Sequence, residues 1–93
     1  MEPVDAWPHL SELCRLATAY PRLQVWLFGS ALTSEASADL DVLLVYVNRA
    51  DVVAVRLARW WPDFDPPLRI IAMTADEERH YGFIAHTHAV PIV

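Results

Sequence analysis

The chain has 93 residues and a formal net charge of −5, with only seven Lys plus Arg. This charge argues against a protein that coats a nucleic-acid backbone, because such affinity comes from neutralising phosphates with basic side chains. Hydrophobic residues make up 55% of the chain, more than so small a core readily hides, so we expect an exposed apolar patch and with it a protein partner or a homodimer.

Three further features bound the class of protein. The single cysteine, Cys14, excludes an internal disulfide. The strongest unbroken apolar run, Val42 to Val47, is far shorter than the ~20 residues that a membrane-spanning helix needs. The first residues, "MEPVDAW", have neither the basic region nor the apolar run of a signal peptide. We therefore expect a single cytoplasmic domain over residues 1–93, with no membrane contact.

The first predicted elements are a helix and a strand. Apolar residues at nearly helical spacing from Leu10 to Tyr20 predict the helix, with Pro8 in its first turn and Pro21 after its end. Leu23 to Phe28 contains β-branched and aromatic residues and predicts a short strand, which Gly29-Ser30 ends.

The next predicted elements are a short helix and a buried strand. Residues 31–38, "ALTSEASA", are compatible with one or two helical turns. The segment from Asp39 to Val47 is the most convincing strand in the chain, and its six consecutive apolar residues imply burial on both faces.

The last predicted elements are a helix, a third strand and a final helix. Helix formers with one apolar side occupy residues 49–61, and "LRIIAM" at residues 68–73 predicts a strand. Thr74 and Glu77 form a capping-box pattern at the start of the final helix. The order α-β-α-β-α-β-α predicts an α/β (α+β) domain with a three-stranded sheet and helices over at least one face.

Two carboxylates open the buried strand. Asp39 and Asp41 are two residues apart, so they share one face of the strand with Cβ atoms roughly 6 to 7 Å apart, while Leu40 points to the other layer. Two like charges on one face repel each other unless a cation lies between them, and a hard cation such as Mg²⁺ prefers oxygen ligands. At the end of the preceding strand, Gly29 lets backbone N–H groups and the Ser30 hydroxyl approach a phosphate. We therefore expect a phosphate cradle to face a metal site.

This layout resembles the nucleotidyltransferase superfamily typified by DNA polymerase beta, and in size it is similar to the minimal nucleotidyltransferases. The matching residues are Phe28, Gly29, Ser30, Asp39, Leu40, Asp41 and Val42. The resemblance implies a mixed sheet with helices packed on it, a Gly-Ser turn that holds the β- and γ-phosphates of an NTP such as ATP, and aspartates that hold two Mg²⁺ ions. It implies transfer of NMP to a hydroxyl of a protein or small-molecule acceptor, with release of pyrophosphate.

The third carboxylate of the family has no counterpart on the predicted third strand. A third carboxylate on a later strand helps to activate the attacking hydroxyl in the family, whereas the only polar side chain of "LRIIAM" is Arg69. Arg69 is a candidate phosphate contact that takes the place of one metal, or it faces solvent at a sheet edge. Asp63 and Asp65 are alternative acids, but turn chemistry explains them more simply.

The sequence leaves two functional hypotheses. The first is an active Mg²⁺-dependent nucleotidyltransferase, whose acceptor is held by a partner, as some minimal members of the family act with a helical protein in toxin and antitoxin pairs. The second is a non-catalytic module of the same fold that binds a partner protein, for example as an antitoxin. A third possibility is a generic small α/β domain in which the aspartates are merely solvated at the start of a strand. It requires the Gly-Ser and Asp-Leu-Asp motifs to occur at this separation by chance.

Aromatic residues suggest where a partner binds. Adjacent helical residues point about 100° apart, so Trp60 and Trp61 cannot both enter one small core. With Tyr81 and Phe83 they are candidates for an interface, the alternative being a tryptophan that stacks on a nucleotide base.

The histidines near the C-terminus, His80, His86 and His88, admit a metal-site interpretation. We favour exposed histidines near a helix end, where the helix dipole stabilises their charge.

Overall fold

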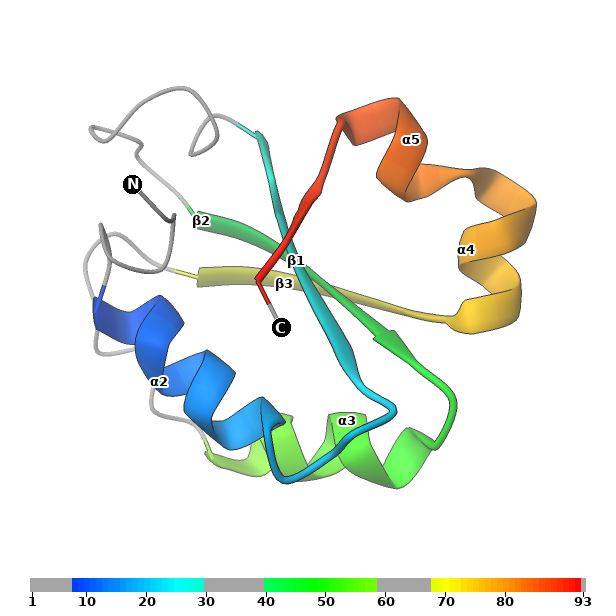
Figure 1. The fold of residues 1–93 in the computed structure, drawn as a ribbon. Coiled ribbons are helices and arrows are strands. Elements are labelled where there is room, and N and C mark those ends of the chain that lie inside the picture. The colour runs from blue at the N-terminus through cyan, green and yellow to red at the C-terminus, as the bar shows by residue number, and fades with distance from the viewer. Residues whose placement is uncertain (1–7, 30–39, 59–67, 93) are drawn as a thin grey trace.

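The computed structural model describes residues 8–29, 40–58 and 68–92 (Figure 1). Its elements are α2 (Pro8–Ala17), β1 (Gln24–Phe28), β2 (Leu40–Tyr46), α3 (Arg49–Ala58), β3 (Leu68–Thr74), α4 (Ala75–Tyr81), α5 (Phe83–Thr87) and β4 (Val90–Pro91). The strands and longer helices predicted for these ranges are present, with ends that differ by a few residues. The short helix predicted for residues 31–38 lies outside the described residues.

The described strands form one mixed sheet in the order β3-β2-β1-β4. β1 pairs antiparallel with both β2 and β4, whereas β2 pairs parallel with β3. The domain is therefore of the mixed α and β class, but the expectation of three strands was wrong. The additional strand, β4, has two residues, and Pro91 cannot donate a ladder hydrogen bond, so no alternating pattern marked it in the sequence.

The hydrophobic core lies between the sheet and the helices α2 and α3, which cover the same face of the sheet (Figure 1). Its buried members are Leu10, Leu13, Ala17, Leu23, Val25, Leu27, Leu40, Val42, Leu44, Val52 and Val55. The register sets Val25 beside Leu44 and Leu27 beside Val42. Burying each such side chain contributes about 1.5–3 kcal/mol, so this layer stabilises the sheet that carries the candidate site.

The central strand β2 is buried on both faces, as its continuous apolar run predicts. Successive side chains of a strand alternate between faces, so Leu43 and Val45 lie on the face opposite the core, yet they are 0% and 3% exposed. Burial ends beyond the strand, where Val47 is 62% exposed.

The final predicted helix is divided in two at Gly82. Its capping box is confirmed, because the Glu77 backbone N–H donates to Thr74 Oγ1 at 3.0 Å and the Thr74 N–H donates to Glu77 Oε1 at 2.8 Å. Gly82 then adopts a left-handed conformation with φ of 63°, and its N–H donates to the Glu78 carbonyl at 2.8 Å. The chain turns there and continues as α5.

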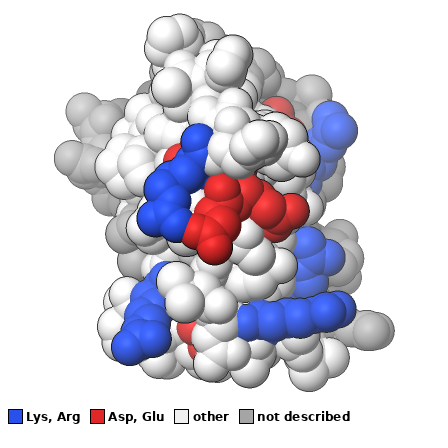
Figure 2. All heavy atoms as spheres, turned by 90° about the vertical axis from the view of Figure 1, so that its right-hand side faces the viewer, with Lys and Arg blue, Asp and Glu red and all other residues white. Residues whose placement is uncertain are grey.

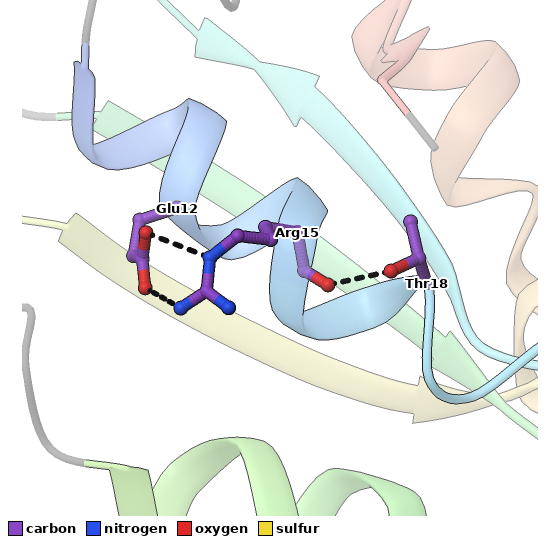
Figure 3. A network of polar contacts seen from close by, with 3 residues as sticks. All are labelled: Glu12, Arg15 and Thr18. Atoms are coloured by element: carbon purple, nitrogen blue, oxygen red, sulfur yellow. Dashed lines mark hydrogen bonds and ion pairs between the residues drawn. The ribbon is translucent and has the colours of Figure 1, made fainter.

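The exposed side of α2 carries a small polar network (Figure 3). Arg15 donates through Nε to Glu12 Oε2 at 3.1 Å and makes a second contact with Oε1, while the Thr18 hydroxyl donates to the Arg15 carbonyl at 2.6 Å. The hydrogen bond from Arg15 holds the pKa of the Glu12 carboxyl below its usual value. Because these groups are exposed, the network orders the end of α2 and contributes little to global stability.

Within the described ranges, no helix is both long enough and apolar enough to cross a membrane.

Candidate phosphate-binding site

The candidate site begins at Gly29, directly after β1. Gly29 has φ of 81°, a left-handed conformation that favours glycine. A Cβ at this position would lie 2.4 Å from Oδ2 of Asp41, closer than any real contact allows. The turn therefore approaches the carboxylate through bare backbone, and no other residue type fits there without displacing Asp41.

Asp41 lies on β2 on the face opposite the main core. Leu40, its neighbour, is fully buried in the core, so the predicted alternation of these two side chains is confirmed. Antiparallel pairing aligns Asp41 with Phe28, the residue before the glycine turn. The side chain of Asp41 is 22% exposed, so its carboxylate is partly shielded but reachable from solvent.

Arg69 lies beside Asp41 on the adjacent strand. The parallel register of β2 and β3 aligns the two residues, so their side chains share one face of the sheet. Arg69 Nε is 3.8 Å from Asp41 Oδ1, and the arginine side chain is 69% exposed. Both sequence interpretations of Arg69 therefore apply in part. It lies on the outer strand of the sheet that the described strands form and is largely solvated, and it also lies next to the candidate site.

An aromatic residue that the sequence analysis did not assign to the site, Phe83, packs against Phe28, the residue before Gly29. Phe83 of α5 packs edge-to-face against Phe28, with ring centroids 5.0 Å apart. Phe83 is half-buried and Tyr81 is 64% exposed, so the expectation that these rings contribute to an interface stays a prediction. Phe28 and Phe83 are 55 positions apart in the chain, and only a pairing of α5 with the end of β1 reveals the contact.

The remaining predicted site residues lie outside the described residues. These are Ser30, Asp39, Asp63, Asp65, Trp60 and Trp61. Of the residues predicted for the site, the structure thus brings together Gly29, Asp41 and Arg69.

The metal-binding potential of the described part rests on Asp41. Over residues 8–29, 40–58 and 68–92, no three His, Cys, Asp or Glu side chains gather in a cluster that could hold a metal ion. His80, His86 and His88 are exposed, and His86 Nδ1 lies 3.0 Å from the Gly82 carbonyl oxygen, a local helical contact. The oxygen donor chemistry of Asp41 fits Mg²⁺, but a cation already lies beside it, so a complete Mg²⁺ site needs Asp39 or a phosphate oxygen as a further ligand.

Chemically, the arrangement offers a turn without a side chain, a carboxylate and a guanidinium side by side. A turn of this kind admits an anion close to backbone N–H groups, and a guanidinium binds phosphate oxygens in a bidentate fashion. The protonated guanidinium accepts no proton, so Arg69 cannot serve as a general base. In comparisons with known proteins, no protein-family model matches this sequence and no curated protein matches it.

Proposed function

We propose that this domain binds a nucleoside triphosphate with Mg²⁺ at the turn after β1 and acts as a nucleotidyltransferase-like domain. The observation that carries the proposal is the close approach of Gly29 to Asp41, two residues twelve positions apart in the chain. A turn without a Cβ leaves its backbone N–H groups open to a ligand, and it suits a turn that admits a phosphate beside a carboxylate.

In this proposal each residue has a distinct role. The backbone at Gly29 and Ser30 binds the β- and γ-phosphates, and Arg69 binds a phosphate oxygen at the rim. Asp41 and Asp39 would hold Mg²⁺, which would supply charge neutralisation for the phosphates. An acceptor hydroxyl would attack the α-phosphorus and release its proton to solvent, the bond between the α-phosphorus and the oxygen that bridges to the β-phosphorus would break, and pyrophosphate would leave.

A second candidate function is favoured by one specific observation. β3 carries Arg69 in the position beside Asp41, and none of its described residues is an acid that accepts the proton of the attacking hydroxyl. A domain of this kind binds the nucleotide without turnover and serves as a nucleotide-dependent binding module for a partner protein.

Calorimetric titration of ATP, with and without Mg²⁺, tests the shared part of both functions. We expect binding that requires Mg²⁺, that is lost in Asp41→Asn, and that is weakened about tenfold or more in Arg69→Ala, because a charge-assisted contact to phosphate is removed. Arg69→Lys keeps the charge but not the planar guanidinium group, so its affinity for ATP should lie between those of the wild type and Arg69→Ala. Arg22→Ala, an exposed arginine in the turn before β1, serves as the matched control. If millimolar ATP, GTP, CTP and UTP all fail to bind, the proposal is wrong.

Transfer of label from α-³²P-labelled NTP separates the two candidates. Label on an acceptor protein, lost in Asp41→Asn, supports the enzyme. Binding that depends on Mg²⁺ and Asp41, with no label transfer and no pyrophosphate release in the presence of cell extract, supports the binding module.

A further inference from the structure

A groove lies at the far end of the sheet from the candidate site, between α3 and the ends of β2 and β3. Its volume is about 250 Å³, and it is lined by Tyr46, Arg49, Val52, Val53, Arg56 and Ala72. Asp41 and Tyr46 are five positions apart on β2, which separates the groove from the candidate site by about 17 Å at the rise of a strand. The groove is therefore a separate surface.

Two arginines give this groove a positive charge on an acidic protein. Arg49 and Arg56 are seven residues apart, or two helical turns, so they project from the same side of α3. Both are exposed, and within the described ranges neither forms an ion pair with a carboxylate. The net charge of −5 shows that acidic groups outnumber basic ones, yet no carboxylate of the described residues pairs with these two guanidinium groups.

Apolar side chains lie between and beside the arginines. Val53, which lines the groove, is 43% exposed, and Leu57, one turn further along α3, is 66% exposed. Val47, just before α3, is 62% exposed. Exposed apolar side chains next to unpaired cations are complementary to a segment that carries both apolar and acidic side chains.

The surroundings of the groove argue for a peptide rather than a nucleic acid. An adjoining groove of about 350 Å³ shares Tyr46 and is lined also by Asp76 and Arg79, which form an ion pair with each other. Figure 2, which looks at the side that carries α4 and α5, shows acidic side chains gathered between basic ones. A phosphate backbone that extends beyond the two arginines meets this negative charge, whereas a short acidic peptide need not.

We propose that the groove of Arg49 and Arg56 binds an acidic peptide segment of a partner protein. Carboxylates of the segment pair with Arg49 and Arg56, and an apolar side chain of the segment covers Val53. The inference does not depend on nucleotide binding, because the residues that carry it lie at the opposite end of β2 from Asp41.

Fluorescence polarisation with a labelled peptide tests the proposal. The probe is a fluorescein-labelled peptide of about a dozen residues in which glutamate and leucine are interspersed with serine, and a version with lysine in place of glutamate is the control probe. We expect saturable binding of the glutamate probe only, weakening as salt is raised above the roughly 0.1 M at which the Debye length is about 10 Å. The variant Arg49→Glu/Arg56→Glu should raise its Kd at least about tenfold.

Matched variants separate local recognition from net charge. Arg22→Glu changes the charge at an exposed position outside the groove and should leave the Kd within about twofold, whereas Arg49→Gln/Arg56→Gln should weaken binding without reversing charge. Asp41→Asn should leave peptide binding unchanged, so loss of the proposed nucleotide site and loss of this surface are distinguishable. The proposal is overturned by equal binding of both probes, by equal effects of the Arg22 and groove variants, by no saturable binding, or by arginine-dependent binding of a labelled single-stranded RNA in place of the peptide.

Discussion

Replacing Gly29 by alanine tests the contact that brings the turn against the carboxylate. The alanine would keep a φ of 81°, which costs an L-residue about 1–2 kcal/mol. Its Cβ would also lie 2.4 Å from Asp41 Oδ2, so Asp41 must rotate away from its position beside Arg69. A side chain forced off its rotamer costs about 0.5–1.5 kcal/mol, and an exposed ion pair contributes at most about 1 kcal/mol. We expect Gly29→Ala to lower the free energy of unfolding by about 2–4 kcal/mol.

Gly82→Ala provides the matched control. Gly82 also has a positive φ, of 63°, but a Cβ there would lie 3.6 Å from His86 Nδ1, an ordinary contact. This variant should therefore lose only the conformational part, about 1–2 kcal/mol. The measurement is urea unfolding followed by circular dichroism, with both alanines also made in an Asp41→Ala background. There the excess loss at Gly29 should disappear, because the oxygen that clashes with the new Cβ is gone.

Two results would refute this reasoning. If Gly29→Ala and Gly82→Ala lower the free energy of unfolding equally, the close approach of Gly29 to Asp41 does not contribute to the cost of the substitution. An excess loss at Gly29 that persists in the Asp41→Ala background would place its cause elsewhere in the turn. A change in the slope of the unfolding free energy with urea would instead indicate a changed denatured state, which the Gly82 variant controls for.

Three further predictions concern the scaffold. Thr74→Ala removes the cap of α4 and should lower stability by about 1 kcal/mol in thermal unfolding, and an unchanged Tm would contradict the cap's role. Leu44→Ala, in the core, should cost about 2–5 kcal/mol. The exposed Leu57→Ala should stay within about 0.5 kcal/mol of wild type in the same assay, and similar losses for both leucines would contradict the burial described above. Burial raises the pKa of the Cys14 thiol, so its contribution to stability, complete below the unfolded pKa of about 8.5, should be lost as pH rises through the folded pKa. Cys14→Ala should show less of this alkaline loss in urea unfolding, and an identical pH dependence of the two proteins would argue against a buried thiol.

Local sequence signals account for most of the elements. The continuous apolar run of β2, the period of α2 and the capping box of Thr74 and Glu77 are patterns within a few residues, and each predicted its element. Gly29 was predicted as a turn for the same reason. β4 was missed because two residues with a proline contain no period, and the contact between Phe83 and Phe28 was not predicted because the two rings belong to distant segments.

The sequence by itself determined where the longer strands and helices form and that Asp41 points away from the core, because burial and alternation are set by neighbouring side chains. Only the tertiary structure decided that Arg69 lies beside Asp41, since this depends on the parallel register of two segments joined through a helix. The same holds for the groove of Arg49 and Arg56, which exists because α3 packs across the ends of β2 and β3. Which distant segments pair depends on how the whole core packs. The sequence therefore shows the residues of both surfaces, but it does not show which of them are neighbours.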